Sequence, residues 1–243
     1  MSFYPKFNKG SILQKNMLEA LQNNPVDAIR LFYRDYGQGI IKGFDVTVDE
    51  GGTIEVAAGI LKIDNDIFFS TQSLSIAVQD GTNYVYLKKL QTEQDAGITV
   101  TFELESSNEP HENEFELFRY VKNAVLKKYS SFSELNGTQR NRINQQQVKY
   151  AIPGGSTISP EIFKLYAEAV FNKKFDVEDI IFAYSCLNET LTKPLIDKYF
   201  GKSETNEQLI KLMREKLSKL GENNIVEDKP APVARPTKTM VYN

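Results

Sequence analysis

The residue types that carry most enzyme chemistry are scarce in this sequence. His111 is the only histidine and Cys186 the only cysteine. A Ser-His-Asp or Cys-His arrangement would need His111 as its base, and His111 lies in a stretch, 105–114, of acids, serines and asparagines. Cys186 stands on the apolar face of an expected helix, where a thiol serves as a packing group. Carboxylates are plentiful, but no spacing singles out a hydrolase pair, so we expect no catalytic residues and no enzyme activity.

The spacing of residues in this sequence does not match the motifs that bind metals or nucleotides. Asp64 and Asp66 could contact a hard ion, but the glycine and glutamate of an EF-hand loop are absent, so a plain turn is the favoured interpretation. Gly37-Gln38-Gly39 has Lys42 where the dinucleotide fingerprint has its third glycine, and a strand is expected to follow. Gly201-Lys202-Ser203 lacks the upstream glycine of a Walker-type loop. We therefore expect no metal and no cofactor.

Charge and hydropathy exclude two further classes of partner. The formal net charge is −3, with 41% apolar and 25% charged residues. This charge gives no general attraction to nucleic acid. No apolar run approaches the roughly 18 residues of a membrane helix, so no membrane insertion is expected. The first residues lack the apolar region of a signal peptide, which predicts synthesis in the cytoplasm.

The elements begin with an N-terminal arm and helices, residues 1–36. Phe3, Tyr4 and Phe7 in the arm are the candidate partner contacts, because aromatic side chains bury a large area in an interface. Covering the protein's own sheet is the alternative role for them. After a first apolar helical stripe, Asn24 and Pro25 predict a break, with Asn24 capping a second short helix that starts at Pro25.

Residues 37–129 predict an antiparallel β-sandwich or barrel-like module. Apolar residues alternate with polar ones at Phe44, Val46 and Val48, and a turn at 49–52 leads into a return strand. The pattern continues as about eight short strands, with turn residues about every ten positions.

The period changes after Tyr129. Residues 130–147 are polar, which predicts a linker or a short surface helix, and Pro153-Gly154-Gly155 marks a break, so the linker is expected to span residues 130–158. Residues 159–220 predict a helical domain of four helices, the first capped by Ser159 and the last by a capping box of Thr205 and Gln208.

In the second of these helices, the sequence predicts an apolar face from Val177, Ile180, Ile181, Tyr184 and Leu187. Residues 221–243 contain three prolines and no periodicity, which predicts a flexible tail. The expected fold class is α+β.

One stretch resembles a known family. Tyr36-Gly-Gln-Gly-Ile-Ile-Lys-Gly-Phe-Asp-Val-Thr-Val, followed by Gly51-Gly-Thr-Ile-Glu-Val-Ala-Ala-Gly-Ile-Leu, is similar to N-terminal domains of phage tail-fibre and baseplate proteins. The strands from Asn83 and from Glu114 are similar to the closing strands of that module, so the resemblance covers roughly 36–127. The opening Phe3-Tyr-Pro-Lys-Phe resembles the start of small tail proteins from Gram-positive phages and phage-tail-like bacteriocins.

The resemblance implies a non-catalytic structural part of a phage-type tail, and the family has no catalytic residues to carry over. Its expected partners are other tail or baseplate proteins and fibres, and a homo-oligomer in the particle is expected. The expected location follows: synthesis in the cytoplasm, then assembly into a phage or phage-tail-like particle. The alternative is a receptor- or glycan-binding protein of the same particle, which would need an exposed aromatic or polar groove in the β module.

Overall fold

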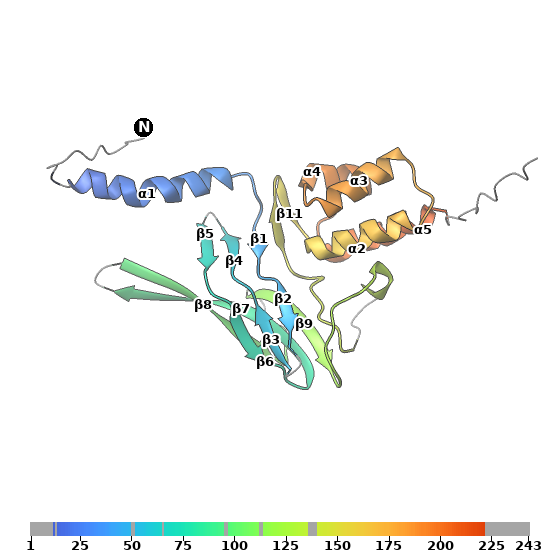
Figure 1. Ribbon diagram of the computed structural model, residues 1–243, viewed down its shortest axis with the longest axis horizontal. Helices are drawn as coiled ribbons and strands as arrows, with labels where there is room; N and C mark the ends of the chain where they lie inside the picture. Colours follow the sequence, from blue (N-terminus) through green and yellow to red (C-terminus); the bar gives the residue numbers. More distant parts are fainter. Residues whose placement is uncertain are drawn as a thin grey trace, which may run out of the picture.

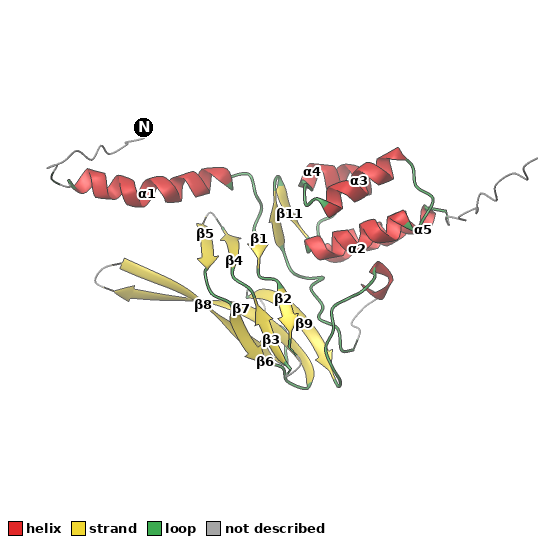
Figure 2. Cartoon of the chain, in the orientation of Figure 1, coloured by secondary structure: helices red, strands yellow, loops and turns green. Residues whose placement is uncertain are grey.

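The computed structural model describes residues 12, 14–49, 52–64, 66–94, 97–111, 114–135 and 140–221. Over these residues the chain is an α+β protein, which confirms the expected fold class. A helix precedes the strands and four helices follow them (Figures 1 and 2). Phe3, Tyr4 and Phe7 lie outside the described residues, as does the tail after Gly221.

The strands form three sheets. One has the order β11-β10-β1-β4-β5, the second β2-β3-β6 and the third β8-β7-β9. The bounds are β1 Gly39–Gly43, β2 Val46–Val48, β3 Thr53–Val56, β4 Gly59–Ile63, β5 Asp66–Ser70, β6 Leu74–Ala77, β7 Gly81–Gln94, β8 Gly97–Ser107, β9 Phe115–Lys122, β10 Tyr150–Ile152 and β11 Gly155–Thr157. Among the described residues, the named strands pair antiparallel except β1 with β10, where Ile40 lies opposite Tyr150. One apolar core, which includes Val56, Leu61 and Phe118, joins side chains from all three sheets.

The turn from β1 to β2 depends on a glycine. Gly43 has a φ of +75°, and a Cβ at this position would lie 2.2 Å from the carbonyl oxygen of Ala58. Phe44 follows in a left-handed conformation, and its ring is fully buried in the β core. The Gly-Phe pair of the family-like stretch therefore has a structural role, in which glycine allows close strand approach and phenylalanine fills the core.

The N-terminal helix is one element, α1 (Lys15–Phe32), where the sequence predicts two. Pro25, expected to start the second helix, lies inside α1. Proline removes one backbone donor, so the unpartnered carbonyl is that of Leu21, four residues earlier. Both residues are exposed, and water can satisfy this carbonyl, which explains how the helix continues through the proline.

Residues 130–158 differ from the expected linker. They contain a 3-10 helix, η1 (Phe132–Leu135), and the hairpin β10–β11. Arg119 and Asn144 exchange both backbone hydrogen bonds, at 2.9 and 2.8 Å, so this segment continues the pairing of β9. Phe132 and Val148 are buried in the two cores. The prediction of a linker was wrong because the few apolar side chains of this polar segment point inward. Backbone hydrogen bonds fix the remainder of the segment.

The C-terminal part has the four predicted helices, α2 (Pro160–Phe171), α3 (Val177–Leu187), α4 (Lys193–Phe200) and α5 (Asn206–Lys219). Ser159 caps α2, and the capping box of Thr205 and Gln208 is formed at α5. These helices pack around a second apolar core that also takes in η1. In Figure 1 they lie at the opposite end of the molecule from α1. Whether this part and the β module unfold as separate units stays a prediction.

Candidate interaction surfaces

The first candidate surface is formed by exposed apolar side chains along α1. Within this helix only Met17 and Ala20 are buried. Leu31 is 66% exposed and Phe32 73% exposed. The exposed apolar side chains, called here the α1 face, are Leu18, Leu21, Val26, Leu31 and Phe32. Figure 1 shows α1 at the opposite end of the molecule from the C-terminal helices, and β5 is a strand that it contacts.

A buried lysine holds the end of α1 on the sheet. Lys62 of β4 is buried, and its ammonium donates hydrogen bonds to the carbonyl oxygens of Tyr33, Arg34 and Tyr36 at 2.9, 3.1 and 2.7 Å. These carbonyls lie just past the last turn of α1, where the helix dipole favours a cation. Arg30 adds an ion pair to Asp66 at 2.8 Å. The anchored end fixes the direction of α1.

The second candidate surface is on α3, and it reverses the predicted face. Val177, Ile181 and Tyr184, expected to point inward, are 73%, 60% and 56% exposed, and Leu187 is also exposed. Ile180 alone of the predicted face is half-buried. The side that packs on the core carries Asp179, Phe182, Ala183 and Cys186.

A polar network explains the reversal. The Tyr199 hydroxyl donates to Oδ1 of Asp179 at 2.6 Å and lies 3.4 Å from the Tyr166 hydroxyl. The ring of Tyr199 stacks on Phe182, with centroids 3.9 Å apart. Lys216 lies 3.4 Å from the same carboxylate oxygen. A buried carboxylate with these partners is satisfied, so α3 can turn an acidic residue inward, which apolar periodicity alone does not predict.

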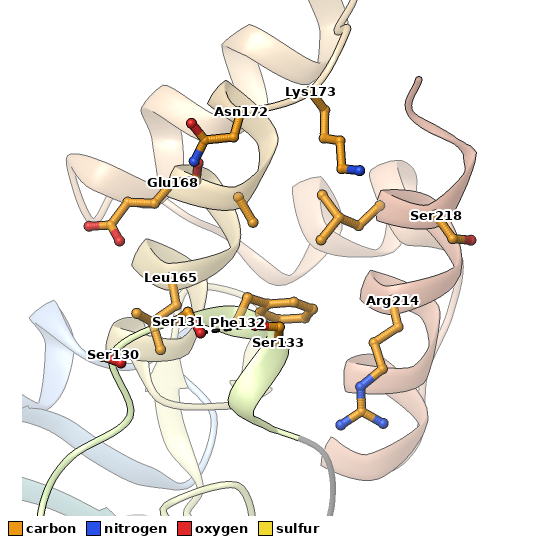
Figure 3. A pocket seen from close by; sticks show the side chains of 12 residues that line it. Ser130, Ser131, Phe132, Ser133, Leu165, Glu168, Asn172, Lys173, Arg214 and Ser218 are labelled. Atoms are coloured by element: carbon orange, nitrogen blue, oxygen red, sulfur yellow. Dashed lines mark hydrogen bonds between the residues drawn. The ribbon is translucent and has the colours of Figure 1, made fainter. Parts of the chain in front are cut away.

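The third surface is a groove of about 630 Å³ between α2, α5 and η1. Figure 3 shows Phe132 on its floor, with Leu165 on the α2 side and Arg214 on α5. Glu168 and Lys173 lie along the rim. Its lining serines have no histidine beside them, so the lining offers contacts with a peptide or small molecule and no nucleophile–base pair.

His111 lies in a packed position beside the β7 strand. Its ring stacks on Tyr86, with centroids 5.0 Å apart, and its backbone N–H donates to the Tyr86 hydroxyl at 2.8 Å. Its Nδ1 lies 3.0 Å from a carboxylate oxygen of Glu114. These contacts give His111 a structural reason to be present. They are more specific than the solvated loop that the sequence predicts.

Cys186 is buried in the helical core, as its position predicts. Burial raises the pKa of its thiol well above the ordinary value. A thiol that is both covered and protonated is a poor nucleophile. This agrees with the packing role proposed from the sequence.

The motifs interpreted from the sequence as turns and loops make structural contacts. Asp64 accepts a hydrogen bond from the Gln38 side chain at 3.4 Å, and Asp66 pairs with Arg30. Across the described part of the chain, no group of three acidic, histidine or cysteine side chains could hold a metal ion. Gly201 ends α4 with a φ of +97° and belongs to no phosphate loop. None of the described helices is long and apolar enough to cross a membrane.

Comparisons with known proteins identify no family. No family model matches the sequence, and no curated protein matches it. Among solved structures, the crystal structure of TssK is similar over 92% of this chain and 71% of TssK, with 10% identity and a TM-score of 0.35. At this TM-score the likeness carries no inference about function.

Proposed function

We propose that this protein is a non-catalytic structural component of a phage-type tail baseplate that links the baseplate to receptor-binding fibres through protein–protein contacts. The observation that carries the proposal is the α1 face, a helix that presents Leu31 and Phe32 to solvent while Lys62 fixes its end. Helices in proteins gain most of their stability from packing an apolar side. A helix built this way gains stability when a neighbouring protein covers it.

The sequence resemblance supports the choice of particle. Residues 36–127, which carry it, form the β module from which α1 extends. The glycines of the resembling stretch include Gly39 of β1, where a Cβ would lie 2.2 Å from the carbonyl oxygen of Lys149. The glycine therefore allows β1 to approach the start of β10 closely. Within such a particle we infer contacts with other tail proteins and a homo-oligomeric arrangement, after synthesis in the cytoplasm. The aromatic arm of Phe3, Tyr4 and Phe7 precedes α1 in the chain and is proposed to contact the same neighbour.

The receptor- or glycan-binding alternative gains little from the β module. A hollow of about 390 Å³ there is lined by residues such as Asp49, Asp80 and Lys122, and none of its lining residues is aromatic. Sugar-binding sites commonly stack the ligand on aromatic rings. The hollow has a polar lining, as this alternative requires, but no aromatic ring, so it supports the alternative less than the α1 face supports the baseplate proposal.

The proposal is tested by locating the protein. Contractile or phage-type particles from the producing strain would be purified and labelled with gold-conjugated antibodies raised against the full chain. Label at the baseplate end is the expected result, with the chain present in mass spectra of the same particles. Absence of the chain from intact particles, or label along the tail tube, would overturn the proposal.

A further inference from the structure

The exposed side of α3 is an apolar surface of limited size. Its members, called here the α3 stripe, are Phe175, Val177, Ile181 and Tyr184. Phe171 packs edge-on against both Phe175 and Tyr184, which fixes the two aromatic rings at the margins of the stripe. Contiguous apolar side chains on a protein surface generally mark a contact site.

The size of the stripe decides what kind of occupant it suits. A helix of 11 residues is about 16 Å long, at 1.5 Å per residue. A stable interface between separate proteins buries about 800 Å² on each partner, which four side chains on one short helix cannot supply. A segment of the same chain needs less area, because its local concentration is already in the millimolar range when the linker is short.

The described chain ends beside this stripe. The backbone N–H of Lys174 donates to the carbonyl oxygen of Gly221 at 2.7 Å, and Gly221 lies against the Lys174 side chain. Lys174 directly precedes Phe175, the first residue of the stripe. The 22 residues that follow Gly221 in the sequence, 222–243, therefore begin next to the start of α3.

The composition of this segment fits the stripe. Ile225 and Val226 follow Gly221 by four and five residues. At roughly 3.3 Å per extended residue they reach about 13 to 17 Å, which covers the length of α3.

We propose that residues 222–243 dock on the α3 stripe of their own chain, with Ile225 and Val226 as the apolar contacts. This proposal does not depend on the proposed function. Its consequence is that α3 is closed to other proteins by the chain itself, which leaves α1 as the open helical surface.

Disulfide trapping in the full chain tests the docking. The variant Glu178→Cys/Glu227→Cys places one thiol beside the stripe and one just after Val226, and the buried Cys186 stays out of the reaction. The matched control Lys211→Cys/Glu227→Cys has its first thiol on exposed α5, also within reach of the tail. Docking predicts that the first variant oxidises about tenfold faster, the ratio expected for about 1.4 kcal/mol of preference.

A further variant separates docking from mere reach. Adding Ile181→Asp to Glu178→Cys/Glu227→Cys removes an exposed apolar contact without touching the core, and oxidation should slow to the rate of the control. Circular dichroism checks that each variant is folded. Equal rates in the first pair, or a disulfide that links two copies and doubles the mass on a non-reducing gel, would overturn the proposal.

Discussion

The ammonium of Lys62 lies 2.7 Å from the carbonyl oxygen of Tyr36, and two further carbonyls share the same cation. One buried side chain of β4 thereby joins the sheet to the end of α1. The geometry explains how a helix with few packing neighbours holds a fixed direction.

Replacing Lys62 with methionine should loosen α1. The variant leaves carbonyl oxygens without their donor, and loss of a charged hydrogen-bond donor costs about 2 kcal/mol in the free energy of unfolding. Urea denaturation measures this cost, and circular dichroism measures the loss of helix. Lys42→Met is the matched control, because Lys42 lies exposed on the neighbouring strand β1. Equal stability of the two variants would contradict the anchoring role.

Gly43 and Gly52 form a natural pair for testing strand approach. Both have a φ near +80°, at +75° and +80°, but a Cβ at Gly52 meets no atom within 4 Å. Gly52→Ala should therefore cost only about 1 kcal/mol, for the backbone conformation. Gly43→Ala should cost about 3 kcal/mol or more, because the backbone of Ala58 must also move. Thermal unfolding of both variants decides, and a similar loss in each would show that the close approach is unimportant.

Local patterns in the sequence predict which helices and strands form better than they predict which side chains are buried and which strands pair. The caps at Ser159 and Thr205 place α2 and α5 correctly, because capping is a local interaction. The face of α3 was wrong because it depends on Tyr199 reaching Asp179 from another helix. Ile40 and Tyr150 pair although more than a hundred residues separate them in the sequence, and no local pattern predicts this pairing.

The candidate surfaces show the same limit. The α1 face can be seen in the sequence as a helical stripe, but a stripe looks the same whether the protein's own core or a partner covers it. The apolar stripe that ends at Leu21 therefore predicted a helix and did not indicate what covers it. The exposure of the α3 stripe could not be predicted from the sequence, because its apolar spacing is also that of residues buried in a core.

The Asp179 network predicts an acid-dependent loss of stability. Burial opposes ionisation of this carboxyl, but hydrogen bonds from Tyr199 and the Asp176 backbone, with the nearby Lys216, more than offset it, so its pKa lies below the ordinary value. A lowered pKa gives stability that is present above the unfolded-state pKa of about 3.9 and is lost as pH falls through the folded-state pKa.

Asp179→Asn should therefore cost about 2 kcal/mol of unfolding free energy at neutral pH. The difference from the unmodified protein should narrow below about pH 4, where the carboxyl of the unfolded chain takes up its proton first. Urea denaturation at several pH values measures both. A difference that stays constant down to pH 2.5 would show that the charge of Asp179 contributes nothing.

His111→Ala should leave particle function intact. The variant keeps the backbone hydrogen bond to Tyr86 and loses only the ring stack and the contact with Glu114, which are together expected to contribute about 1 kcal/mol. Killing or infection assays with assembled particles measure the outcome. Normal assembly with lost activity would contradict a non-catalytic protein.

We propose that the α1 face is where this protein joins its neighbours. The test variant is Leu21→Glu/Leu31→Glu, which adds two charges to exposed apolar positions. The control, Asn16→Glu/Asn23→Glu, adds the same charges to exposed polar positions of the same helix. Thermal unfolding should be nearly unchanged in both isolated proteins, because surface positions contribute little to stability.

Quantitative immunoblotting of purified particles then gives the number of copies incorporated by each variant, relative to the unmodified protein. We expect the number of incorporated copies of Leu21→Glu/Leu31→Glu to fall about tenfold or more, the ratio for a loss of about 1.4 kcal/mol in docking free energy. The control should stay near the level of the unmodified protein. Incorporation of the Leu21→Glu/Leu31→Glu protein at the level of the control would contradict this proposal.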